Sequence, residues 1–159
     1  MTRLRLIVGT MAVLIGMGMI SYAQDVENNT HLGTWVLTVT PPAGGPPAFK
    51  ALASFASGGV FISSGQNDHV NTGVGIQQGT WRRTAGGQIT STEISFIYGP
   101  TGVAVGTLKV RATYDFSDAN NLTGQGQLLR CDLSGANCQS LGCAGIQGTR
   151  VEVEEPDCP

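Results

Sequence analysis

The chain has 159 residues, a formal charge of −2 and only 13% charged residues. A mildly acidic chain without a basic cluster lacks the positive footprint that nucleic acids and anionic membrane surfaces attract. We therefore expect no nucleic-acid partner, and the length suits a single domain with one core.

The first 23 residues have the pattern of a cleaved secretory signal. Arg3 and Arg5 give a basic start, Leu6–Ile20 carries no charge, and Ser21–Ala23 ends on a small residue. The alternative is an uncleaved anchor, but a membrane span needs ~20 apolar residues. Cleavage after Ala23 predicts a secreted or periplasmic single domain over residues 24–159, with no remaining membrane span and a charge of −4, from seven basic and eleven acidic residues.

The rest of the chain alternates between apolar and polar residues, with glycines at regular intervals, which favours strands over helices. We predict eight strands, in chain order Gly33–Thr40, Phe49–Ala56, Val60–Ser64, Gln77–Thr84, Gln88–Tyr98, Val103–Phe116, Leu122–Cys131 and Thr149–Glu154. Short connections make successive strands antiparallel neighbours, and closing the sheet removes both edges. The prediction is an all-β, eight-stranded antiparallel up-and-down β-barrel. An eight-stranded sandwich is the alternative, but it needs long crossing connections, and these are few.

The connections differ in length between the two ends of the predicted barrel. The second, fourth and sixth are tight, at 57–59, 85–87 and around Asn120. Three others are long, at 41–48, 65–76 and 132–148, and all project from the opposite end. Loops on a rigid scaffold often carry recognition, and the mouth of a barrel is a common ligand site. The proline-rich segment 41–47 is either a semi-rigid flap over that mouth or a surface linker.

Strand alternation assigns side chains to the two faces of the barrel wall. Leu108 and Tyr114 fall on an apolar set that faces inward, so Lys109 and Arg111 face outward. The same rule turns Glu93 outward and its apolar neighbours inward. The predicted cavity residues are Trp35, Leu37, Phe55, Phe61, Trp81, Phe96, Tyr98, Leu108 and Tyr114.

The four cysteines, Cys131, Cys138, Cys143 and Cys158, all lie near the end of the chain. In an exported protein they predict two disulfides with three possible connectivities, and a four-cysteine zinc site is the alternative. A strand of ~7 residues separates the barrel ends by ~23 Å, whereas a disulfide needs Cα atoms within ~7 Å. Pairing Cys158 therefore requires that segment 132–148 folds down the outside, that the tail doubles back, or that a second chain takes part.

Two short motifs lie on the first and last predicted strands. Gly33-Thr34-Trp35 gives a G-x-W on the first strand, and Arg150 lies on the last. This combination resembles the lipocalins and the wider calycin group, and the likeness is to small exported bacterial lipocalin-like proteins. The resemblance implies that Trp35 plugs the closed end and that an arginine packs over it. The chain departs from the family in lacking a visible C-terminal helix and the T-D-x signature, and the predicted last strand places Arg150 nearer the open end.

The leading functional hypothesis is a non-enzymatic barrel that binds a small apolar ligand at its loop-rich open end. No P-loop, dinucleotide fingerprint or G-x-S-x-G elbow is present in the sequence, so we expect no catalytic residue, cofactor or metal. One alternative is a protein-binding or envelope-structural module that presents the long loops. Another is an isomerase or cyclase, which would need a buried titratable residue that the pattern does not reveal.

Overall fold

The computed structural model describes residues 29–66, 68 and 73–156. The predicted signal peptide, His69 and Cys158 lie outside the described residues. Within the described ranges, no helix is both long enough and apolar enough to cross a membrane.

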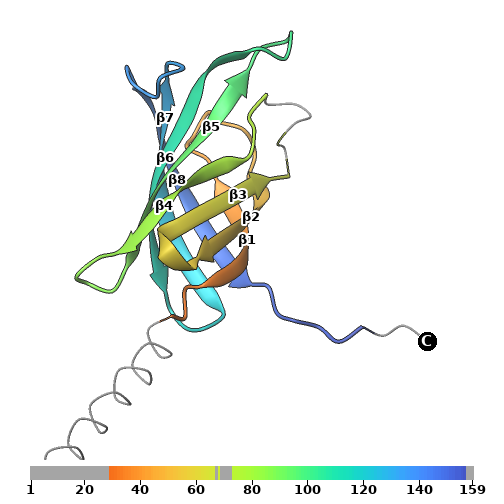
Figure 1. The fold of residues 1–159 in the computed structure, drawn as a ribbon, viewed down its shortest axis with the longest axis vertical. Coiled ribbons are helices and arrows are strands. Elements are labelled where there is room, and N and C mark those ends of the chain that lie inside the picture. Colours follow the sequence, from red (N-terminus) through yellow and green to blue (C-terminus); the bar gives the residue numbers. More distant parts are fainter. Residues whose placement is uncertain (1–28, 67, 69–72, 157–159) are drawn as a thin grey trace, which may run out of the picture. The chain divides into compact units, whose positions relative to one another are not determined.

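Eight antiparallel strands form a closed barrel in the unit His31–Pro159 (Figure 1). The strands are β1 (Gly33–Thr40), β2 (Phe49–Ala56), β3 (Val60–Gly65), β4 (Gln77–Arg83), β5 (Ile89–Tyr98), β6 (Ala104–Phe116), β7 (Asn121–Cys131) and β8 (Gln139–Arg150). Each strand pairs with the next, and β1 pairs with β8 from Trp35↔Arg150 to Thr40↔Gly145. The predicted up-and-down barrel is confirmed, and the sandwich is excluded.

The eighth strand lies earlier in the chain than predicted. The prediction placed it at Thr149–Glu154, whereas β8 spans Gln139–Arg150 and pairs with β7 along its length. This segment contains Gly142, Gly145 and Gly148, so three of its twelve positions carry no side chain. Its pattern is hidden because backbone pairing, rather than apolar side chains, marks it as a strand. The predicted long connection 132–148 is therefore wrong, and a tight turn at 132–138 takes its place.

The barrel has one end with only tight connections and one end with longer ones. The short helical turn η1 (Ser57–Gly59) and the turns at 84–88 and 117–120 lie at what we call the closed end. The connection 41–48 and the described residues between β3 and β4, which are 66, 68 and 73–76, lie at the opposite, open end, together with the short turns at 99–103 and 132–138. Strands β5 to β8 have 10 to 13 residues, against 6 to 8 in β1 to β4. Figure 1 shows the longer strands rising past the shorter ones at the open end.

The inward and outward faces of β5 are the reverse of the prediction. Phe96 and Tyr98 are 50% and 42% exposed on the outer face, whereas Glu93 is 2% exposed and faces inward. The reason is the register with β6, in which Glu93 lies opposite Val110 and Ile89 lies opposite Tyr114. Cross-strand partners face the same side of a sheet. Once Val110 and Tyr114 face inward, as predicted, Glu93 must do so too.

Candidate functional site

Aromatic side chains fill the closed half of the barrel. The set that we call the aromatic plug consists of Trp35, Phe55, Phe61, Trp81, Tyr114 and Phe116. Phe55 is central, with ring centroids 4.9 Å from Phe61 and 5.1 Å from Tyr114 in edge-to-face geometry. Such pairs add to the free energy gained from burial alone. The closed half is therefore a packed core without room for a ligand.

An arginine covers the plug from outside. The guanidinium carbon of Arg150 lies 4.4 Å from the centroid of the Trp35 ring, which is a cation–π contact. The predicted last strand had placed Arg150 nearer the open end. Because β8 ends rather than begins at Arg150, the residue instead lies opposite Trp35 at the closed end. The tryptophan–arginine contact that the lipocalin resemblance implied is present in the structure.

His31 packs beside the aromatic plug at the closed end, a position that the sequence did not indicate. Its backbone oxygen accepts a hydrogen bond from Trp35 Nε1 at 3.1 Å, and its ring meets the edge of Trp81 at 4.5 Å between centroids. Arg83 Nη2 donates to His31 Nδ1 at 3.0 Å. Burial lowers the pKa of His31, and the positive charges of Arg83 and Arg150 lower it further. The closed end therefore holds a neutral histidine between two cations.

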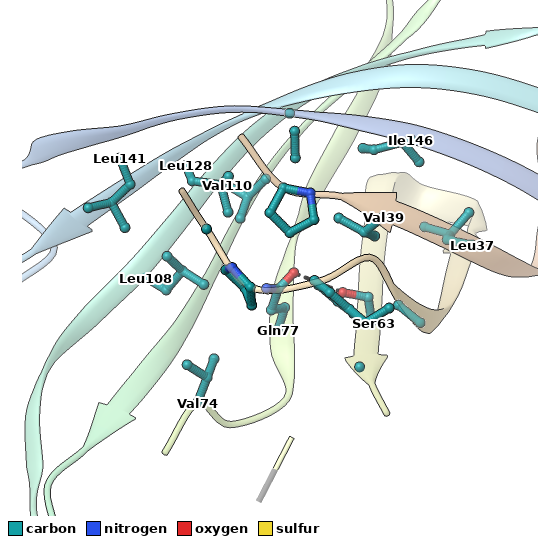
Figure 2. Close-up of a pocket in the computed structure, with 18 of the residues that line it drawn as sticks. Leu37, Val39, Ser63, Val74, Gln77, Leu108, Val110, Leu128, Leu141 and Ile146 are labelled. Carbon is teal, nitrogen blue, oxygen red and sulfur yellow. Dashed lines mark hydrogen bonds between the residues drawn. The ribbon is translucent and has the colours of Figure 1, made fainter. Parts of the chain in front are cut away.

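The open half of the barrel is hollow. It contains a cavity of about 520 Å³ that opens toward the long connections (Figure 2). Most of its wall is apolar, and the side chains that form it include Leu37, Val39, Phe49, Phe61, Leu108, Val110, Leu128, Ala144 and Ile146. The side chains labelled in Figure 2 come from β1, β3, β4, β6, β7 and β8, and from the connection between β3 and β4. The cavity is therefore the interior of the barrel itself and not a surface depression.

The predicted cavity residues divide into three groups in the structure. Leu37, Phe61, Leu108 and Tyr114 line the cavity. Trp35, Phe55 and Trp81 belong to the aromatic plug below it. Phe96 and Tyr98 lie on the outer face, because the phase of β5 is reversed. The predicted set did not include Val39, Val110, Leu128, Ala144, Ile146 or Glu93. Strand alternation was a signal for two of them, because it put Val39 on the face of Leu37 and Val110 on the face of Leu108.

The proline-rich connection 41–48 lies over the mouth of the cavity. Residues 41–46 line it, and Gly45 N–H donates to the carbonyl oxygen of Pro42 at 2.9 Å, which makes a turn in the segment. Pro42 also packs against β8 at Gly142, where an added Cβ would lie 3.0 Å from the proline ring. These contacts match a flap over the mouth better than a surface linker.

Glu93 carries a buried carboxyl group on the inner wall, between the plug and the cavity. Ser91 Oγ donates to Glu93 Oε1 at 2.7 Å, and Tyr114 Oη donates to the same oxygen at 3.1 Å. Burial raises the pKa of Glu93 to about 7, against the opposing effect of these two hydrogen bonds. Burial and the nearby Glu93 carboxylate also raise the pKa of Tyr114. Glu93 therefore exchanges its proton near neutral pH, and it does so inside an apolar cavity.

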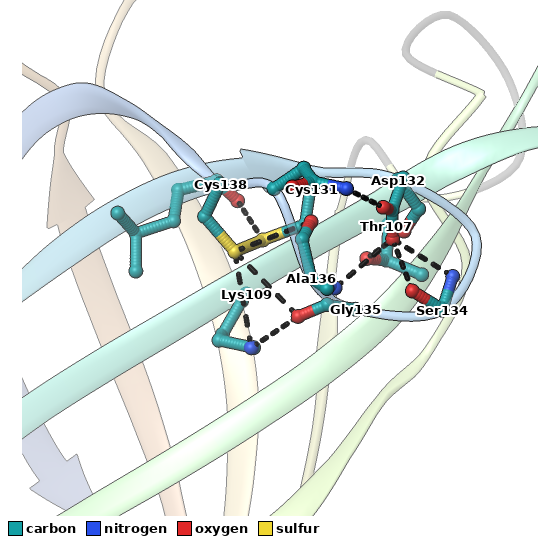
Figure 3. Close-up of a disulfide and its surroundings, with 10 residues drawn as sticks. Thr107, Lys109, Cys131, Asp132, Ser134, Gly135, Ala136 and Cys138 are labelled. Carbon is teal, nitrogen blue, oxygen red and sulfur yellow. Dashed lines mark hydrogen bonds between the residues drawn. A yellow bond between two sulfur atoms is a disulfide. The ribbon is translucent and has the colours of Figure 1, made fainter.

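The open end is fastened from outside by a disulfide turn. Cys131 and Cys138 are bonded across the β7–β8 turn, and Lys109 Nζ donates to the carbonyl oxygen of Gly135 at 2.5 Å (Figure 3). Of the two predicted disulfides, one is present among the described residues, where Cys143 is a free and exposed thiol that β8 turns outward in mid-strand; Cys158 lies outside those residues. Among the described residues, no cluster of three or more potential metal ligands occurs.

Comparison with protein-family models, with curated proteins and with solved structures finds no match to this chain. The closed eight-stranded barrel is consistent with a lipocalin-like fold. Any function must therefore be argued from the cavity and its side chains, since a fold alone does not fix a function.

Proposed function

We propose that the barrel is a non-enzymatic binding protein that holds one small apolar molecule in its open half. The proposal rests on one observation, which is that the open half of the barrel is hollow whereas the closed half is packed. A cavity of about 520 Å³ lies in the range of small-molecule sites, and its wall is mainly apolar. The flap at 41–46 lines the mouth, so it would shield part of a bound molecule from water.

We further propose that binding takes place outside the cytoplasm. The signal pattern of the first 23 residues supports export. The Cys131–Cys138 disulfide fits the same compartment, because such bonds persist in oxidising surroundings.

Uptake of a hydrophobic fluorophore by the purified protein tests the proposal, with two matched variants. Ala144→Trp places a large ring on the cavity wall and should abolish uptake. Phe96→Ser removes an apolar side chain that is exposed on the outer face, and should leave uptake unchanged. The proposal fails if the fluorophore is not taken up, or if Phe96→Ser and not Ala144→Trp removes the signal.

A second candidate, a barrel isomerase, is favoured by Glu93. That hypothesis required a buried titratable residue, and Glu93 is one, with a pKa of about 7 and access to the cavity. Its carboxylate would take a proton from the carbon next to a ketone and return it two carbons further along, with no redox change. The test is the conversion of a β,γ-unsaturated ketone to its conjugated isomer, followed by ultraviolet absorbance. Turnover by the wild type that is lost in Glu93→Gln supports the isomerase hypothesis. The absence of turnover in the wild type rejects it.

A further inference from the structure

The hydrogen bonds of Glu93 leave one side of its carboxyl group available. Ser91 and Tyr114 both donate to Oε1. No hydrogen bond to Oε2 is found among the described residues, and Glu93 is part of the cavity wall. Oε2 is not among the buried polar atoms that lack a partner, so it is open to the cavity. In these apolar surroundings the ionised carboxylate favours a ligand group that brings both a proton donor and a positive charge to Oε2.

The charges around the cavity have one sign. The titratable groups that line it are Asp68 from the connection between β3 and β4, Glu93 from β5 and Tyr114 from β6. Strands β1, β2, β7 and β8 contribute only apolar side chains and glycine to the lining, and β4 places Gly79 opposite Glu93. No Lys, Arg or His is found among the described residues of the wall. A ligand carboxylate would meet two like charges and, among the described residues of the wall, no cation.

We propose that the cavity selects apolar monoamines, with the ligand's ammonium group paired to Glu93 Oε2 and its hydrocarbon part against the wall formed by Leu108, Val110, Leu128 and Ile146. This assignment rests on the proposed function and names its ligand class. The ammonium group supplies the missing donor and offsets the buried charge. The amine also holds Glu93 in its ionised form, because an opposite charge nearby lowers the pKa of a carboxyl group.

Three probes that differ only in their head group test the proposal: n-octylamine, n-octanol and n-octanoate. Each is titrated calorimetrically into the wild-type protein and into Glu93→Gln at about pH 8, above the pKa of Glu93. In wild type, the amine should bind ~10-fold or more tightly than the alcohol, since hydrogen bonds to charged groups are worth that much. The octanoate should bind more weakly than the alcohol. In Glu93→Gln the amine should lose its advantage while the alcohol still binds.

Two further measurements separate this effect from general attraction to an acidic protein. Glu152→Gln removes an exposed carboxylate outside the barrel and should leave amine affinity unchanged. In wild type, amine affinity should rise between about pH 6 and about pH 8 as Glu93 ionises, whereas octanol affinity should stay level. The pH comparison needs no variant, so it holds even if Glu93→Gln does not fold.

Each outcome bears on a different claim. Equal binding of amine and alcohol in wild type overturns the amine assignment and leaves the proposed function standing. A preference for the amine that persists in folded Glu93→Gln overturns the role of Glu93. If none of the three probes binds, the proposed function itself is wrong.

Discussion

The closed and open halves of this barrel share the same eight strands but have opposite interiors. In the closed half, Trp35 and Phe55 are fully buried in edge-to-face aromatic contacts. In the open half, the wall side chains surround an empty volume, and Glu93, the one buried carboxyl group in the described part of the chain, lies where the two halves meet. One half of the barrel can therefore supply the stability of the fold while the other is free to carry a site.

The largest effect should come from truncating the aromatic plug. Trp35→Ala removes a fully buried ring and the surface on which Arg150 packs, so it should lower the free energy of unfolding by about 3–5 kcal/mol. Leu128→Ala is the matched change in the open half. Because Leu128 is only half-buried and faces the cavity, its loss should be about 1 kcal/mol. Urea unfolding followed by circular dichroism measures both, and equal losses would mean that the halves are equally packed.

Glu93 should make the open half sensitive to pH. Its pKa in the folded protein, about 7, is higher than the ordinary value of 4.5, so folding favours the protonated form. The stability that it contributes is fully present below about pH 4.5 and is lost as the pH rises through 7. Between about pH 5 and about pH 8, the swing should be about 3 kcal/mol.

Glu93→Gln isolates that swing, because glutamine mimics the protonated acid. The variant should match wild type near pH 5 and exceed it in stability near pH 8. His31 acts in the opposite sense, since its lowered pKa makes folding favour the neutral ring and stability fall in acid. That effect is common to both proteins and cancels in their difference. A difference that does not change with pH would place Glu93 in contact with water.

The disulfide turn should stabilise the open end without shaping its cavity. Replacing Cys131 and Cys138 together by serine releases a loop closed over a sequence separation of 7. Chain entropy predicts a loss of about 2.5 kcal/mol. Cys143→Ser, at an exposed free thiol, is the control and should change little. Fluorophore uptake should survive in both variants below their unfolding midpoints, and its loss in the double variant alone would tie the turn to the cavity.

The sequence predicted seven of the eight strands, but it did not predict two features on which the site depends, the position of β8 and the direction of Glu93. Alternation located β1 to β7 to within one residue at each end, because side chains of clear polarity occupy both faces. β8 was missed because its inner face includes Gly148 and its outer face Gly145, which carry no polarity signal. Glu93 was assigned to the wrong face because the register of β5 against β6 decides its direction, and register is a property of two strands.

Glycine-to-alanine substitutions in the two halves should differ in their effect on stability, and this difference is the smallest that we predict. An added Cβ at Gly148 would lie 2.6 Å from Leu37 Cδ2 and 2.9 Å from Leu122 Cγ; Leu122 is packed in the core, and Leu37 is buried where the core meets the cavity wall. At Gly126, on the cavity wall, the nearest atom is Val110 Cγ1 at 3.3 Å. Gly148→Ala should therefore cost about 1–3 kcal/mol through overpacking. Gly126→Ala should be neutral or stabilise by up to about 1 kcal/mol, because alanine restricts the unfolded chain and Val110 can shift into empty space. Thermal unfolding of both variants measures the two effects. An equal loss of stability at Gly126 and Gly148 would show that the open half is packed as tightly as the closed half.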